Sequence, residues 1–321
     1  MVTGTQSVTL KTASIEVVVL AAGASVRSIR LAGVPHSLGV GTPDLSVYGA
    51  ANRAFLGATI GRNANRLGGA RLPVDGTVHA LSINEAPNQL HGGTTGFWSR
   101  DWTIAEASAS RAVMTLESPD GEDGYPGTAK VRAIFTVEEP GTLRIRYEGT
   151  VDRRSVLNMT AHLYVNLSGG AATRDHLLEI DGDAYLPVDA GLIPTGEIRP
   201  VAGTPFDFRV AKPLADGPDM LDHNFCLNGG RTAAPRPVAR MRAGGVELAL
   251  STTERGLQIY DGALFDGSIA GLDGGTIGPH GAIAIEPQQW PDAPNQPGFP
   301  PTLVDAGEVY AHESLYRFSR V

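Results

Sequence analysis

The sequence contains a single cysteine, Cys226, among its 321 residues. One thiol cannot form an internal disulfide, and it cannot build a metal site that needs several thiolates. Cys226 lies in the segment DHNFCLNG, where the expected environment is that of a small buried strand residue. We therefore expect a packing role for this cysteine rather than a reactive thiol.

Lysine is also scarce, and its three occurrences lie in segments that do not resemble a site, which argues against a Schiff-base mechanism. The net charge of -8 is distributed along the chain rather than collected in a tail. This pattern gives no sign of a nucleic-acid surface, and it indicates a small partner that is not strongly anionic. The eight histidines are scattered without the close spacing typical of metal sites, so we expect no metal.

Long apolar runs are missing as well. No uncharged stretch approaches the length that spans a membrane, and the N-terminal segment has no basic region leading into a long apolar run. We therefore expect no membrane partner and a soluble, cytoplasmic protein. The sequence leaves open whether it is a monomer or a homodimer, because no segment marks an edge strand that pairs across an interface.

Glycine and proline are abundant, at 40 and 22 residues, and they recur between short segments rich in β-branched residues. Segments such as SIEVVVL, AKVRAIFTVE and GTLRIRYEGTV alternate, and no stretch keeps a helical period over three turns. This pattern predicts an all-β fold, a large antiparallel β-sandwich. Because no segment has the composition of a linker, we expect one domain over residues 1–321.

The segment TAHLYVNL, residues 160–167, alternates polar and apolar side chains. As a strand it places His162, Tyr164 and Asn166 on one face, and Leu163 and Val165 on the other. A sheet with a core face and a wet face would explain this alternation. A polar face that looks into a ligand cleft is the alternative, and His162 is then a candidate for chemistry.

The segment GAIAIEPQQW places Glu286 at the predicted end of a strand, on the same face as Ala282 and Ala284. Small neighbours would leave room for a ligand, and Pro287 restricts Glu286 to extended backbone angles. A solvated glutamate at a strand end is the alternative. The proline-rich segment that follows, residues 286–302, is predicted to be a loop outside any sheet.

Two further loops are rich in polar residues, NEAPNQLHGG at 84–93 and SPDGEDGYPG at 118–127. The second has acidic residues like those of a calcium loop but lacks the full ligand spacing, so a surface hairpin is the better interpretation. Other segments offer groups that commonly bind sugar hydroxyls. These are Asn65, Arg66, His91, Asp222, His223 and Gln258. For each one taken separately, a solvent-exposed side chain or a structural hydrogen bond is the alternative.

Several long motifs occur in one order: GATIGRNANR, APNQLHGG, DGEDGYPG, TAHLYVNLSG, LDHNFCL, LQIYDG and EPQQWPDAPNQPGFPPT. From about residue 55 to the C-terminus this set resembles the aldose 1-epimerase (galactose mutarotase) family. The resemblance implies a large antiparallel β-sandwich with a sugar site in a cleft on one sheet. It also implies that no cofactor is needed.

Carried over by motif, the resemblance makes Glu286 the catalytic base and His162 the acid. It also implies that five further residues bind the sugar: Asn65, Arg66, His91, Asp222 and Gln258. For an acid and a base with ordinary pKa values, the required forms coexist only in a mildly acidic window, unless the site raises the pKa of the histidine.

The implied activity is the interconversion of the α and β anomers of free aldoses such as glucose or galactose. Two alternatives stay open, a non-catalytic sugar-binding relative and an epimerase of a modified or phosphorylated sugar. Pro287, Asp261 and Ala263 depart from the residues common in the family, which bears on substrate preference.

Overall fold

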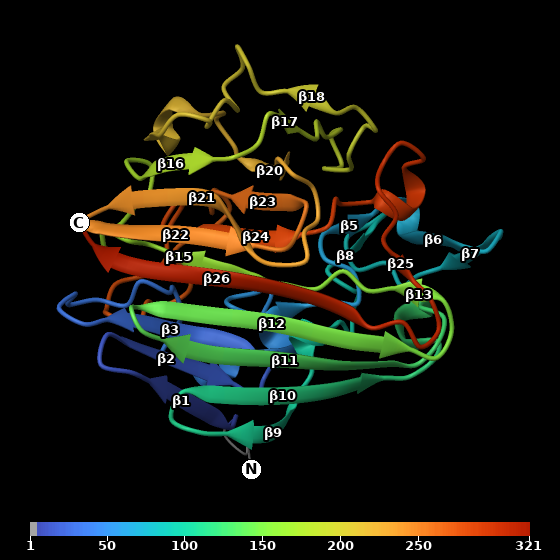
Figure 1. The fold of residues 1–321 in the computed structure, drawn as a ribbon, viewed down its shortest axis with the longest axis horizontal. Coiled ribbons are helices and arrows are strands. Elements are labelled where there is room, and N and C mark those ends of the chain that lie inside the picture. Colours follow the sequence, from blue (N-terminus) through green and yellow to red (C-terminus); the bar gives the residue numbers. More distant parts are fainter. Residues whose placement is uncertain (1–4) are drawn as a thin grey trace.

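The computed structural model describes residues 5–321 of the chain. Two large antiparallel sheets lie against each other as two layers, with smaller sheets at their edges (Figure 1). This arrangement confirms the predicted all-β antiparallel sandwich.

The larger sheet has nine strands, and every neighbouring pair in it is antiparallel. In spatial order they are β19 (Lys212–Pro213), β16 (Leu177–Ile180), β21 (Arg236–Ala243), β22 (Val246–Thr252), β26 (Tyr310–Arg320), β12 (Thr142–Val151), β11 (Ala129–Glu138), β10 (Arg111–Ser118) and β9 (Thr103–Ala107). Strand β12 shows why they form: Leu143, Ile145 and Tyr147 are buried on one face, while Arg144 and Arg146 alternate with them on the other.

The second sheet has six strands. In spatial order they are β15 (Leu163–Val165), β24 (Ile283–Gln288), β23 (Gly256–Tyr260), β20 (Asp222–Cys226), β17 (Ala184–Tyr185) and β18 (Arg199–Pro200). All residues of β24 are buried, so both of its faces are covered by protein. One face packs toward the nine-stranded sheet, and the other carries Glu286.

Smaller sheets complete the strand inventory of the described residues. They are β1 (Ser7–Lys11) with β2 (Ile15–Leu20) and β3 (Ser25–Leu31), β4 (Thr59–Ile60) with β14 (Thr160–Ala161), β5 (Arg66–Leu67) with β8 (Gln89–Leu90), β6 (Arg71–Val74) with β7 (Thr77–Ala80), and β13 (Ser155–Val156) with β25 (Leu303–Val304).

Helical structure within residues 5–321 consists of short 3-10 turns. They are η1 (Leu45–Val47), η2 (Gly49–Ala51), η3 (Gly68–Ala70), η4 (Phe97–Ser99), η5 (Glu122–Gly124), η6 (Leu214–Asp216) and η7 (Ala293–Asn295). None of the helices in this range has the length and apolar character needed to cross a bilayer.

The main core lies between the two large sheets. Ile145 and Phe318 of the nine-stranded sheet belong to the same buried cluster as Leu163 and Ile285 of the six-stranded sheet. Cys226 is also buried, within β20, and burial raises the pKa of its thiol to about 12. The prediction of a buried strand cysteine is therefore confirmed.

The loop at residues 118–127 joins β10 to β11, which confirms a hairpin connection. The prediction for the proline-rich segment is wrong at its start, because Glu286, Pro287 and Gln288 belong to β24. Pro287 is accommodated because β24 pairs with β23 on one side as far as Gln288, whereas its pairing with β15 ends at Ile285. The rest of the segment is an ordered loop that contains η7.

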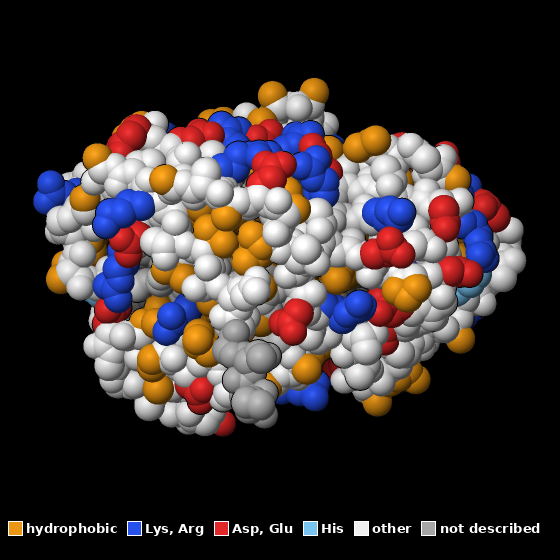
Figure 2. Space-filling model, turned by 90° about the horizontal axis from the view of Figure 1, so that it is seen from below, with side chains coloured by type: hydrophobic (Ala, Val, Ile, Leu, Met, Phe, Trp, Pro, Cys, Tyr) orange, Lys and Arg blue, Asp and Glu red, His pale blue; other side chains and the backbone are white. Residues whose placement is uncertain are grey.

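The surface carries both signs of charge. On the face in Figure 2, Lys and Arg side chains are interspersed with Asp and Glu. Exposed ion pairs such as Lys130 with Glu117 and Arg132 with Glu148 join neighbouring strands. This mixture agrees with the absence of a charge run in the sequence.

Candidate active site

His162 is placed by a change of strand partner. The predicted continuous strand is interrupted at this residue, because β14 pairs with β4 while β15 pairs with β24. The His162 N–H donates to the Ala58 carbonyl at 2.8 Å, and the His162 carbonyl accepts from the Gly57 N–H at 3.1 Å. Both backbone groups are satisfied, so the imidazole is held at a fixed point between the two strands.

Glu286 lies inside β24, directly opposite Gln258 of β23, rather than at a strand end. The small neighbours Ala282 and Ala284 do not leave room for a ligand, since both are fully buried in a cluster with Tyr164 and Phe265. Those aromatic rings occupy the space that the alanines leave, and they form one side of the pocket.

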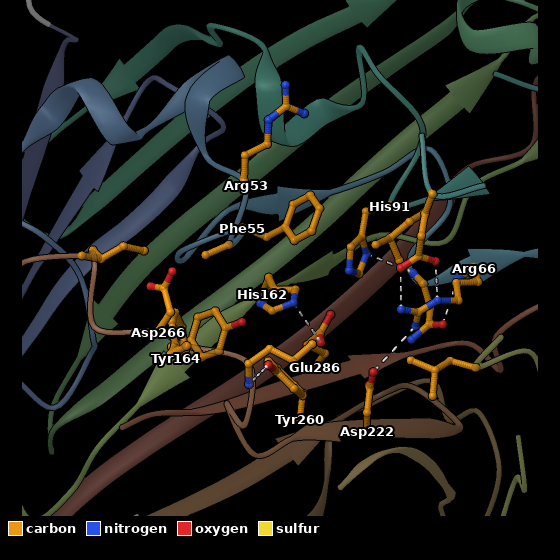
Figure 3. Close-up of a pocket in the computed structure, with 18 of the residues that line it drawn as sticks. Arg53, Phe55, Arg66, His91, His162, Tyr164, Asp222, Tyr260, Asp266 and Glu286 are labelled. Carbon is orange, nitrogen blue, oxygen red and sulfur yellow. Dashed lines mark hydrogen bonds and ion pairs between the residues drawn. The ribbon is translucent and has the colours of Figure 1, made fainter. Parts of the chain in front are cut away.

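His162 and Glu286 face each other in this pocket (Figure 3). His162 Nε2 lies 3.5 Å from Glu286 Oε1, and the two residues are 4% and 2% exposed. The other nitrogen of His162 and the other oxygen of Glu286 have no hydrogen-bond partner among residues 5–321. Buried polar atoms in proteins are normally paired, so this site is suited to bind a polar ligand.

Burial controls the ionisation of the pair. It raises the pKa of Glu286 well above its usual range, the nearby Asp222 acts in the same direction, and Arg66 opposes them. Burial lowers the pKa of His162 to about 3. This shift is opposite to the raised pKa that would let His162 act as an acid beside a glutamate with an ordinary pKa. The raised pKa of Glu286 and the lowered pKa of His162 both favour a neutral pair, in which the carboxyl group of Glu286 is protonated and the imidazole of His162 is uncharged.

Arg66 anchors the polar end of the pocket. Its Nε and one terminal nitrogen donate to the two carboxylate oxygens of Glu85, at 2.6 and 2.8 Å. Its other terminal nitrogen is 3.7 Å from Asp222 Oδ2, and Gln258 donates to Asp222 Oδ1 at 2.6 Å. Burial raises the pKa of Asp222, while Arg66 and Gln258 counteract this effect.

Asn65 directly precedes β5 and His91 directly follows β8, and these two short strands pair with each other. The Asn65 side-chain oxygen accepts from the Arg66 N–H at 2.8 Å, which leaves its amide nitrogen available to the pocket. The His91 ring lies 5.2 Å from the His162 ring, edge to face. Burial, His162 and Arg66 lower the pKa of His91 well below its usual value.

The structure brings six of the seven predicted site residues into the wall of one pocket of about 740 Å³. They are Asn65, Arg66, His91, His162, Asp222 and Glu286. Gln258 lies behind this wall, in contact with Asp222. His223 packs against Phe206 instead, outside the residues that line the pocket.

Sequence reasoning missed Glu85 and three aromatic lining residues, Phe55, Tyr260 and Phe265. Glu85 lies in the polar loop at 84–93, and Tyr260 is two residues from Gln258, so both had a signal. No sequence signal identified Phe55, because its place in the pocket depends on a loop that brings the centre of its ring to 4.6 Å from that of His91.

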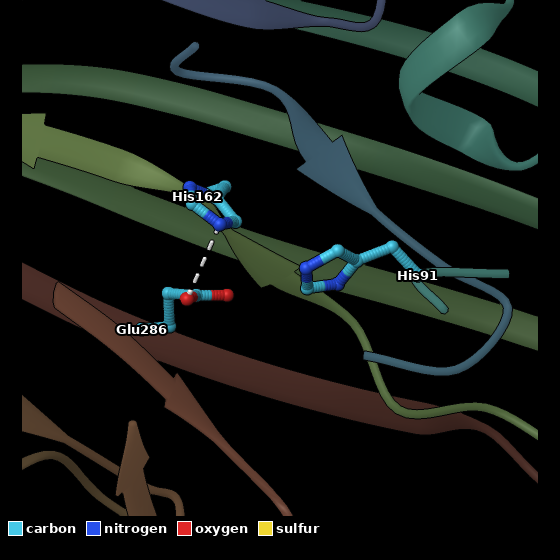
Figure 4. A group of neighbouring side chains, drawn as sticks. All are labelled: His91, His162 and Glu286. Atoms are coloured by element: carbon cyan, nitrogen blue, oxygen red, sulfur yellow. Dashed lines mark ion pairs between the residues drawn. The ribbon is translucent and has the colours of Figure 1, made fainter. Parts of the chain in front are cut away.

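His91, His162 and Glu286 form a compact group that no local spacing predicts (Figure 4). One ring nitrogen of each histidine and a carboxylate oxygen lie within 4.8 Å of one another, close enough to meet one metal ion. The scattered histidines of the sequence are therefore partly gathered in space. The expectation of no metal stays a prediction.

Comparison with known proteins places these features in a family. The model of the aldose 1-epimerase family matches residues 6–317. The chain is 41% identical over 274 residues to the galactose mutarotase of Homo sapiens, covering 83% of this chain and 79% of that protein. It is 36% identical over 282 residues to the aldose 1-epimerase of Escherichia coli K12, covering 83% and 80%.

The fold agrees with the sequence comparison. The crystal structure of an aldose epimerase homologue from C. elegans matches with a TM-score of 0.93 and 28% identity, over 99% of both chains. This protein therefore belongs to the aldose 1-epimerase family.

Proposed function

We propose that this protein is an aldose 1-epimerase that interconverts the α and β anomers of free aldoses such as glucose or galactose. The observation that carries the proposal is the buried pair of His162 and Glu286, 3.5 Å apart in a pocket with hydrogen-bonding groups at one end. The family membership of the chain supports the same activity.

Mutarotation moves two protons and breaks one bond. Ionised Glu286 takes the proton of the anomeric hydroxyl while protonated His162 donates to the ring oxygen, so the C1–O bond of the ring breaks and an aldehyde forms. Rotation about C1–C2 then presents the other carbonyl face, and both proton transfers reverse. Positioned acid and base groups typically contribute about 10²- to 10⁴-fold to a rate.

The reactive form of the pair differs from its favoured form before the sugar binds only in the position of one proton. A proton on Glu286 must move to His162 to give carboxylate and imidazolium, and the 3.5 Å separation of Oε1 and Nε2 suits this transfer. Sugar hydroxyls that donate to Glu286 stabilise its ionised form and so favour the transfer. The remaining orphan oxygen of Glu286 supplies an acceptor for such a hydroxyl.

Asn65, Arg66, His91 and Asp222 are proposed to bind the sugar hydroxyls, with Gln258 orienting Asp222. Their groups supply donors and acceptors in fixed planes, as recognition of hydroxyls requires. Two arginines line the pocket, Arg53 and Arg66, against four acidic residues, Glu85, Asp222, Asp266 and Glu286. This balance favours a neutral sugar over a phosphorylated one.

Proton NMR of the anomeric signals tests the activity. Freshly dissolved α-D-glucose, α-D-galactose and a set of pentoses are followed with and without catalytic amounts of protein. We expect a faster approach to the same anomeric equilibrium for at least one sugar. Binding of these sugars without any acceleration would instead assign the pocket to recognition.

We further propose that the chain acts in the cytoplasm as a monomer or homodimer and that its partner is a small sugar, neither nucleic acid nor membrane. The dispersed charge and the absence of a long apolar run support this proposal. Sedimentation of the purified protein over a range of concentrations would identify the oligomeric state.

A further inference from the structure

A buried aspartate lies behind the wall of the pocket. Asp261 directly follows Tyr260, the last residue of β23, and it is 3% exposed. The pairing of β23 with β20 sets Tyr260 opposite Asp222, so these two residues are neighbours in the wall (Figure 3). Asp261 is one of the positions where the sequence departs from the residues common in the family. The role of its carboxylate therefore has to be read from its own contacts.

Both carboxylate oxygens of Asp261 accept a hydrogen bond from the backbone. Oδ2 accepts from the Leu221 N–H at 3.3 Å, and Oδ1 accepts from the Ala263 N–H at 3.2 Å. The Asp261 N–H donates in return to the Leu221 carbonyl at 2.9 Å. Leu221 is thus held to Asp261 by two hydrogen bonds, and it directly precedes Asp222, the first residue of β20. One side chain therefore ties the start of β20 to the turn that follows β23.

The turn that follows β23 forms another part of the pocket wall, since Leu264 and Phe265 both line the pocket. The Leu264 N–H donates to the Tyr260 hydroxyl at 2.9 Å, and the Phe265 N–H donates to the Gly262 carbonyl at 3.2 Å. The hydrogen bond accepted by Asp261 Oδ1 adds a third constraint at the start of this turn. The position of the two apolar lining residues therefore depends in part on Asp261.

Two basic side chains lie beside the buried carboxylate. His280 Nδ1 is 3.3 Å from Asp261 Oδ2, and Arg174 Nη1 is 4.0 Å from the same oxygen. His280 is itself held in place, because its N–H donates to the Gly262 carbonyl at 3.0 Å and its carbonyl accepts from the Thr173 N–H at 2.8 Å. Burying a carboxylate is costly unless it has basic partners and hydrogen-bond donors, and Asp261 has both.

We propose that Asp261 is a positioning residue for sugar binding, because it sets the places of Asp222 and of the turn that follows β23. This inference rests on the proposed epimerase activity. A carboxylate accepts hydrogen bonds at both oxygens, whereas an amide has one acceptor and carries an NH2 group at the other position. Asp261→Asn would therefore set a donor against the N–H of either Leu221 or Ala263, and that N–H would lose its partner.

Steady-state kinetics of Asp261→Asn tests the proposal. We expect KM to rise about tenfold, because the wall that binds the sugar shifts. We expect kcat to change less than about threefold, because His162 and Glu286 are held by other segments. The matched control is Asp207→Asn, since Asp207 also accepts from a backbone N–H and from a guanidinium, both of Arg209, near the surface. An unchanged KM in Asp261→Asn, an equal rise in the control, or a fall in kcat at constant KM would overturn the proposal.

Amide hydrogen exchange of the sugar-free protein tests the anchor apart from turnover. We expect slow exchange at the Leu221 and Ala263 N–H groups of the wild type, and faster exchange at one or both of them in Asp261→Asn. Equal exchange in the two proteins would overturn the proposal. If Asp261→Asn proves unfolded, Asp261→Thr, with a single side-chain oxygen, takes its place with the same expectations.

Calorimetry of galactose binding separates this proposal from the proposed activity. If the wild type binds galactose without accelerating mutarotation, the epimerase assignment fails. Binding that is about tenfold weaker in Asp261→Asn than in the wild type would still support the positioning role. Equal affinity of the two proteins would contradict that role, whether or not the wild type is active.

Discussion

At the residue scale, Glu286 shows most clearly how the fold sets the chemistry. A glutamate inside a strand that is buried on both faces loses its hydration, and its pKa rises well above the usual range. His162, buried opposite, is driven the other way, to a pKa of about 3. The two side chains therefore act as one unit that shares a proton, rather than as an acid and a base with ordinary pKa values.

The shared proton predicts the pH dependence of turnover. The pair gains a second proton only when His162 becomes charged, far below its usual pKa, and loses its proton only when the raised pKa of Glu286 is exceeded. We expect a constant kcat through the neutral range, with a decline on the alkaline side. Turnover measured in buffers of equal ionic strength checks this, and a loss of activity with a midpoint near about 6.5, the ordinary histidine value, would contradict it.

Glu85 is predicted to position Arg66. Glu85→Gln removes one half of a bidentate ion pair, so the guanidinium can turn away from the sugar, and we expect KM to rise about tenfold with a smaller change in kcat. The matched control is Glu197→Gln, which alters a similar bidentate pair with Arg199 on the surface. Equal kinetic effects of the two substitutions would show that Glu85 has no special role.

The residue types of the site could be identified from sequence, but their contacts could not. His162 and Glu286 stand in alternating segments, and their motifs indicate a shared site. That His162 lies where one strand changes partner follows from the pairing of β4 with β14, two-residue strands with too little sequence for a pattern. The ion pair of Arg66 with Glu85 depends likewise on how the loop at 84–93 folds back toward Arg66.

At the element scale, long strands such as β12 and β11 could be located in the sequence. Each has one face in the core, so its apolar and polar residues alternate. Strand β24 was cut short in the prediction, since proline is rarely found inside a sheet. Its true end could not be anticipated without knowing that the neighbouring strand β15 begins at Leu163, opposite Ile285, and so leaves Pro287 unpaired on that side.

The hairpin connection between β10 and β11 supports the loop that follows His91. Asp123 accepts hydrogen bonds from the N–H groups of Thr94 and Thr95, at 3.0 and 2.9 Å. In Asp123→Ala these donors lose their partner, so we expect a loss of about 1–3 kcal/mol in the free energy of unfolding and a fall of about tenfold in turnover.

Denaturant unfolding and steady-state kinetics check both parts of this prediction. The control is Asp152→Ala, which removes an acceptor for the Thr128 N–H at 2.7 Å but does not contact the loop of His91. If Asp123→Ala were as active and as stable as the wild type, the hairpin would not support the site.

At the scale of the whole molecule, the core cluster joins residues of both large sheets and of the three-stranded sheet, including Val17, Ile145 and Ile285. On this basis we propose that the chain forms one domain. The fold class was accessible from the sequence because turns and alternating segments recur along its full length. The order of strands was not, because pairs such as β12 with β26 join segments that are far apart in the chain.

The buried Glu286 of the active site is predicted to lower the stability of the whole molecule as the pH rises. Because the folded pKa of Glu286 is raised, the protein has its full stability below the unfolded pKa of about 4.3 and loses stability as the pH rises toward the folded pKa. Glu286→Gln cannot ionise, so its Tm should exceed that of the wild type increasingly from acid to alkaline pH. Thermal unfolding at several pH values checks this, and a Tm difference that does not change with pH would contradict it.

Polarimetry of freshly dissolved α-D-galactose at neutral pH is the most direct test of the account as a whole. The initial rate of optical rotation change is compared for the wild type, Glu286→Gln and His162→Asn, after each protein is shown to be folded. The account predicts catalysis by the wild type and a loss of at least about 100-fold in each variant. Wild-type turnover in either variant would remove that residue from the mechanism, and catalysis retained in both would contradict the proposed proton-sharing pair.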